Sequence, residues 1–133
     1  MSIELEIVLR ILMAAALGAI IGYQRERAGK PAGLRTVILV CVGAALFTIA
    51  SIYGFGVVAD PSRVAAGIVI GIGFLGAGAI MRRAGGPIEG LTTAATIWVM
   101  AAIGLAIGTG LYIVSLVTTG IILIVLLLPH PIR

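Results

Sequence analysis

Residues 63–83 read RVAAGIVIGIGFLGAGAIMRR, and this stretch decides the fold class. Its interior holds only apolar and small residues, five of them glycines. The run Gly71-Ile-Gly73-Phe-Leu-Gly76 matches the GxGxxG fingerprint of dinucleotide-binding proteins, which requires a strand-to-helix turn and an acidic residue about 20 positions downstream. Glu89 is the only acidic residue downstream, and it lies too close. Because the stretch has about the length that spans a bilayer, we predict a membrane helix.

The composition of the whole chain is that of a membrane protein. Of its 133 residues, 61% are hydrophobic and 11% charged, and the mean hydropathy is +1.25. Such a chain leaves no room for a separate soluble domain, so we expect one transmembrane domain over residues 1–133. The sequence pI near 10.0 does not indicate nucleic-acid binding, because the basic residues lie at the ends of apolar segments and not in one patch.

Five apolar segments can be marked along the chain, at residues 3–23, 34–58, 64–81, 91–107 and 111–128. With the N-terminus outside, seven basic residues face the cytoplasm, as the positive-inside rule requires. They are Arg25, Arg27, Lys30, Arg35, Arg82, Arg83 and Arg133. We therefore predict an all-α integral membrane protein, a compact bundle of about five transmembrane helices with its C-terminus in the cytoplasm. The last two segments are short enough to form a re-entrant hairpin instead.

Glycines predict how these helices meet. Pairs of small residues four positions apart lie on one helix face and allow close backbone approach, which drives association in lipid. The predicted packing glycines are Gly18, Gly22, Gly67, Gly71, Gly73, Gly76, Gly78, Gly104 and Gly108. The glycine-rich segment 64–81 suits the centre of the bundle. The same glycines could also form an interface between copies of the chain, so a homo-oligomer remains an alternative.

Ionisable residues near the predicted outer side are the first functional candidates. Arg10 lies about 10 Å into the first span, where arginine is costly and usually has a partner or a function. We predict a polar cluster of Arg10, Asp60 and Arg63, supported by Glu6. Two simpler interpretations stay open: Arg10 snorkels and pairs with Glu6, or Asp60 only caps the helix that follows Pro61.

A second group of candidates lies near the cytoplasmic helix ends, and it comprises Arg25, Glu26, Arg35, Thr92 and Thr93. Ordinary topology and contacts with lipid headgroups would also explain the charges, and hydrogen bonds between helices would explain the hydroxyls. The sequence holds no spacing typical of a nucleophile with its base, of a metal site or of a phosphate loop. We expect neither catalysis nor a cofactor.

Several blocks, in the right order, resemble the membrane domain of the MgtC/SapB family of bacterial inner-membrane proteins. The blocks are Gly18-Ala-Ile-Ile-Gly22 with Arg25-Glu26, Gly33-Leu34-Arg35-Thr36, Gly43-Ala-Ala-Leu-Phe47, Arg63, Gly71-Ile-Gly-Phe-Leu-Gly-Ala-Gly78, and Gly90-Leu-Thr-Thr-Ala-Ala-Thr96 with Trp98. Gln24 departs from the family, which commonly has glutamate there. The sequence also ends just after the last span, without the soluble C-terminal domain of many members.

The resemblance implies adaptation to low magnesium and, in pathogens, survival inside macrophages. It also implies that the protein modulates other membrane proteins, with the proton-driven ATP synthase as a proposed target. The residues themselves leave two classes open, a modulator that acts through helix contacts and a transporter or channel. We favour the modulator, because the predicted spans hold few acidic residues that could coordinate a divalent cation.

Overall fold

The computed structural model describes residues 2–57, 60–82 and 88–129, and it confirms the predicted helical bundle. Its helices are α1 (Ile3–Arg27), α2 (Leu34–Tyr53), α3 (Ser62–Ala79), α4 (Leu91–Gly108) and α5 (Tyr112–Leu127). The first four are long and apolar enough to cross a membrane. The fifth has 16 residues and a length of about 24 Å, somewhat less than a bilayer core of about 30 Å.

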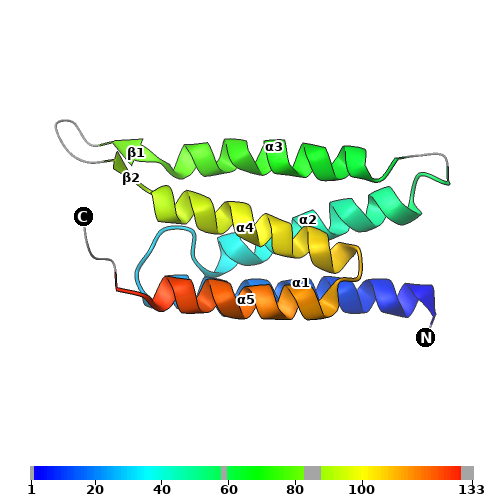
Figure 1. Cartoon of the computed structure of the whole chain (residues 1–133), viewed down its shortest axis with the longest axis horizontal. Helices are drawn as coiled ribbons and strands as arrows, with labels where there is room; N and C mark the ends of the chain where they lie inside the picture. The colour runs from blue at the N-terminus through cyan, green and yellow to red at the C-terminus, as the bar shows by residue number, and fades with distance from the viewer. Residues whose placement is uncertain (1, 58–59, 83–87, 130–133) are drawn as a thin grey trace.

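The helices lie roughly side by side along the long axis of the molecule (Figure 1). In that view α3 forms one edge, α4 and α2 lie in the middle, and α1 and α5 form the opposite side. The α4 helix packs against each of the other four helices. The expectation that the glycine-rich segment is central is therefore wrong, since α4 holds that position and α3 is peripheral.

Burial confirms the central position of α4. Half of the residues of α4 are buried, against 6% of those of α3. The main core is formed where α1, α2 and α4 meet, and its side chains are largely aliphatic. The core residues are Ala14, Leu17, Ile21, Val37, Cys41, Ala45, Met100, Ile103, Ile107 and, from α5, Ile122. Large apolar side chains such as Leu39 and Ile113 are exposed outside this core, as expected of a surface that faces lipid.

A short antiparallel ladder lies between α3 and α4, in the stretch that separates the predicted apolar segments 64–81 and 91–107. Strand β1 (Met81–Arg82) pairs with β2 (Ile88–Glu89). Gly90 then begins α4 with a φ of 91°, a backbone conformation that favours glycine. The ladder brings the end of α3 next to the start of α4, so these two helices pack as an antiparallel pair (Figure 1).

Candidate functional site

The α1 helix carries a buried arginine near each end, and the two arginines lie in different surroundings. Arg10 is near the α1 N-terminus and Arg25 near its C-terminus. Their exposed fractions are 6% and 2%. We call the end of the bundle with Arg25, Arg27, Lys30 and Arg35 the basic end. Arg10 belongs to the opposite end.

Arg10 is joined to three other helices by its guanidinium. Its Nε donates a hydrogen bond to the Tyr112 hydroxyl at 3.0 Å. Its Nη1 donates to the Tyr53 hydroxyl and to the Gly108 carbonyl, each at 3.0 Å. Its Nη2 forms an ion pair with the Glu6 carboxylate one turn earlier. We call these five residues the Arg10 cluster, and they connect α1 with α2, α4 and α5.

The electrostatics of the Arg10 cluster are favourable. Gly108 is the last residue of α4, where unpaired carbonyls and the helix dipole give negative charge that attracts a cation. The Tyr53 ring also lies 5.6 Å from the guanidinium carbon. Gly110 leaves space for this arrangement, because a Cβ atom there would lie 3.2 Å from Arg10 Nη2. The Arg10 side chain is thus well paired, and it connects α1 to three other helices.

Among the described residues, neither Asp60 nor Arg63 forms a hydrogen bond or an ion pair with a side chain of this cluster. The Asp60 carboxylate accepts hydrogen bonds from the Ser62 amide at 3.0 Å and the Ser62 hydroxyl at 2.8 Å. These bonds hold the pKa of Asp60 below its ordinary value. Among the hydrogen bonds and ion pairs of the described residues, none joins Arg10 to either residue. The structure thus corrects the predicted cluster: Glu6 pairs with Arg10, and Asp60 caps the start of α3.

Sequence reasoning missed two members of the Arg10 cluster, Tyr53 and Tyr112. Both are uncharged and lie 43 and 102 residues from Arg10, so spacing did not point to them. A signal was available in the chemistry, however. An arginine has five N–H donors, and the Glu6 carboxylate cannot accept from all of them.

Arg25 is paired less completely than Arg10. Its Nη2 donates to the Pro31 carbonyl at 2.8 Å and to the Thr93 hydroxyl, while its buried Nε has no acceptor. Among the described residues, no carboxylate forms an ion pair with the buried Arg25 guanidinium. The nearby Glu26 carboxylate instead accepts from the Leu34 amide at 3.0 Å and caps α2.

Of the five candidates predicted at the cytoplasmic helix ends, the structure therefore joins Arg25 to Thr93. Glu26 has a capping contact of its own. Arg35 and Thr92 are exposed. The hydrogen bond from the Thr96 hydroxyl goes to the Thr92 carbonyl at 2.7 Å, within α4.

Two glycine pairs bring helices close to α2. A Cβ atom at Gly18 would lie 3.0 Å from Ile38 Cα, and one at Gly22 would lie 2.8 Å from Leu34 Cα. On α4, a Cβ atom at Gly108 would lie 2.9 Å from the Ala45 carbonyl oxygen. Gly104 is at least as close to α2. These four positions therefore have the close backbone contacts that small residues permit.

The glycines of α3 differ from these pairs. Four of them have no atom within 4 Å of an added Cβ, and they are Gly67, Gly71, Gly73 and Gly78. Only Gly76 is buried, and its added Cβ would make an ordinary contact of 3.5 Å with the Ala94 carbonyl. The open glycine face of α3 is thus not used for packing within the described chain.

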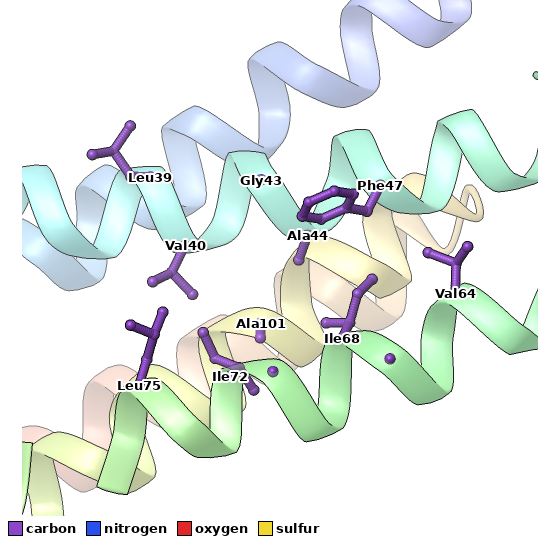
Figure 2. Close-up of a pocket in the computed structure, with 12 residues that line it drawn as sticks. Leu39, Val40, Gly43, Ala44, Phe47, Val64, Ile68, Ile72, Leu75 and Ala101 are labelled. Atoms are coloured by element: carbon purple, nitrogen blue, oxygen red, sulfur yellow. The ribbon is translucent and has the colours of Figure 1, made fainter. Parts of the chain in front are cut away.

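An apolar groove of about 630 Å³ separates α2 from α3. Figure 2 shows Phe47 of α2 and Ile68, Ile72 and Leu75 of α3 along it. Gly67 and Gly71 also line the groove. We call this surface the α2–α3 groove.

The sequence of this chain is similar to sequences of bacterial proteins. A family model described as MgtC family matches residues 11–133. YhiD of Escherichia coli is 47% identical over 132 residues, which cover 94% of this chain and 61% of YhiD. MgtC of Salmonella typhimurium is 48% identical over 116 residues, which cover 87% of this chain and 49% of that protein. SapB of Bacillus subtilis is 41% identical over 117 residues, which cover 83% and 50%. No solved structure matches the chain with significance.

Proposed function

Because the chain belongs to the MgtC family, we propose that this multi-pass membrane protein supports bacterial adaptation to low magnesium by contacting other membrane proteins through α3. The chain spans 61% of YhiD and about half of MgtC and SapB, so activities of those longer proteins come to it only as part of this proposal.

The observation that carries the proposal is the open face of α3. Gly67 and Gly71 lie four residues apart, line the α2–α3 groove and have no neighbour within 4 Å of an added Cβ. In lipid, helices associate through close packing of such small residues. A transmembrane helix of a partner protein would find here a smooth face beside an apolar groove. The proton-driven ATP synthase, implied by the family resemblance, is the first partner to test.

We place the protein in the bacterial inner membrane with the N-terminus outside. The basic end supports this orientation, because Arg25, Arg27, Lys30 and Arg35 lie together there and the positive-inside rule assigns such an end to the cytoplasm.

Leucine substitutions on two exposed helix faces test the proposal. Gly71→Leu would fill the open face of α3, while Gly120→Leu would add the same side chain to α5, where an added Cβ also has no neighbour within 4 Å. Each variant is scored for thermal stability in detergent, for cross-linking to ATP synthase subunits and for complementation of growth in low magnesium.

We expect both variants to fold as the wild type does, and Gly71→Leu alone to lose cross-linking and complementation. Full complementation by Gly71→Leu would refute the contact role of α3. Loss of a homo-oligomer in Gly71→Leu, without loss of any cross-link to another protein, would assign the face to self-association.

A magnesium transporter is the second candidate, favoured by the description of YhiD as a candidate magnesium transporter. The described residues contain no group of three or more His, Cys, Asp or Glu side chains placed to hold a metal ion. Purified protein in liposomes distinguishes the two candidates. Magnesium flux above that of protein-free liposomes would replace the modulator proposal with transport.

A further inference from the structure

Arg25 is a buried cation whose hydrogen bonds are incomplete. Its side chain reaches the first turn of α4 through a hydrogen bond to the Thr93 hydroxyl. Only 2% of the residue is exposed, yet its Nε has no acceptor among the described residues. We propose that Arg25 and the first turn of α4 form a binding site for an anionic phosphate group at the basic end. This site goes beyond the proposed contact role of α3.

The two ends of α4 explain why Arg25 needs an anion and Arg10 does not. Arg10 lies at the C-terminus of α4, where the helix dipole is negative, and it also has the Glu6 carboxylate. Arg25 lies at the N-terminus of α4, where the dipole is positive, so the helix repels its charge. A buried charge without a counter-charge is strongly destabilising, and a bound anion would remove that cost.

The first turn of α4 offers further donors. The first helical hydrogen bond runs from the Ala94 amide to the Gly90 carbonyl at 2.8 Å, so the amides of Leu91, Thr92 and Thr93 precede the helical ladder. The helix has no side-chain cap among the described residues. Free amides at the start of a helix bind phosphate and carboxylate groups readily.

Phosphate suits this donor set. A guanidinium presents its N–H groups in a planar fork that matches phosphate oxygens, and the Thr93 hydroxyl adds a neutral donor beside it. The site lies directly beneath the surface, since Pro31 and Thr92 next to it are exposed. Exposed Arg27 and Lys30 at the same end would attract the anion. The phosphate can belong to a lipid headgroup or be free in solution.

The experiment uses the full chain, purified in phosphate-free detergent. Thermal unfolding is measured against inorganic phosphate, and native mass spectrometry records retained phosphatidylglycerol. The variants are Arg25→Gln and Thr93→Val, with the exposed Arg35→Gln as a control that removes the same charge from the same end. Arg25→Lys replaces Arg25→Gln if the latter does not fold.

We expect phosphate to raise the unfolding temperature of the wild type and of Arg35→Gln in a saturable way. Thr93→Val should bind about tenfold more weakly, the loss expected for one hydrogen bond to a charged group. Arg25→Gln should not respond, and without phosphate it should be at least as stable as the wild type. If the source is lipid, inorganic phosphate has no effect, while phosphatidylglycerol is retained by the wild type and by Arg35→Gln but not by Arg25→Gln.

Glu89 provides the test against an internal partner, because its carboxylate closely precedes α4 in the sequence. If both Glu89→Gln and Arg25→Gln destabilise the protein, contrary to the expectation for Arg25→Gln, and neither phosphate source binds, the counter-charge is the chain's own and the proposal is wrong. Equal loss of binding in Arg25→Gln and Arg35→Gln would also refute it, since attraction to the basic end would then be nonspecific. These readouts do not involve α3, so their failure is distinct from failure of the proposed function.

Discussion

The stability cost of a buried arginine in this molecule depends on the partners of its N–H groups. Arg10 satisfies its guanidinium with a carboxylate, two tyrosine hydroxyls and the carbonyl at the end of α4. Removing it would leave several of these polar groups without a partner in a low-dielectric interior. The stabilising role of Arg10 therefore comes from the whole set and not from its ion pair alone.

The first prediction concerns Arg10→Met. We expect a loss of about 3 kcal/mol of unfolding free energy, because the variant leaves buried partners of a charged group unpaired. Denaturation in mixed micelles measures it, with Arg27→Met as the control at an exposed arginine. In double-mutant cycles, the stability effect of Glu6→Gln should couple to that of Arg10→Met, whereas the effect of Asp60→Asn should be additive with it. Coupling between Arg10 and Asp60 would mean that the originally predicted cluster forms after all.

The second prediction concerns the pH response of Asp60. The Ser62 hydroxyl and amide donate to its carboxylate and lower its pKa, with a smaller attraction from Arg63. Because the folded-state pKa is depressed, the cap stabilises α3 above the unfolded pKa of about 3.9, and this stabilisation is lost as the pH falls through the folded pKa. The NMR shift of the Ser62 amide should follow that titration. Asp60→Asn should abolish the response, and a midpoint at the ordinary Asp value would contradict the capping geometry.

At the scale of the elements, hydrophobic patterning predicted the helices well but not their neighbours. The predicted segments 34–58 and 91–107 correspond to α2 and α4, which end at Tyr53 and Gly108. The centre of the bundle was wrong, because glycine content says that a helix can be approached closely and not which helix approaches it. The hydrogen-bond partners of Arg10 and Arg25 could not be predicted from spacing either, since contacts such as Arg25 with Thr93 join residues 68 positions apart.

The third prediction separates glycines that pack within the chain from those that do not. Gly108→Ala would place a Cβ 2.8 Å from Thr48 Cβ and 2.9 Å from the Ala45 carbonyl, forcing α2 and α4 apart. We expect a loss of about 1–3 kcal/mol for this overpacking. Gly67→Ala on α3 adds the same methyl group where no atom lies within 4 Å, so its unfolding free energy should stay close to that of the wild type. Equal losses for the two variants in denaturation experiments would contradict this difference in packing between Gly108 and Gly67.

For the whole molecule, the uneven distribution of charge leads to the fourth prediction. In a variant with Cys41 replaced by alanine, a cysteine at Lys30 should react with a membrane-impermeant maleimide only after the cells are opened, whereas one at Phe55 should react in intact spheroplasts. The two sites follow α1 and α2, so they lie at opposite ends of the bundle. The expected orientation follows from the basic end. Reaction at Lys30 in intact spheroplasts would reverse the topology.

The arginines of α1 also set a dimension. Arg10 and Arg25 are 15 residues apart, as are their α4 partners Gly108 and Thr93, so the two antiparallel helices are joined at two levels about 22 Å apart. A hydrocarbon core of about 30 Å exceeds that span, so we expect the protein to fit a thinner bilayer better. The joined pair cannot lengthen to match a thicker one, and the mismatch must be taken up by the lipid or by tilting of the bundle. We therefore expect the stability of the protein to depend on acyl-chain length.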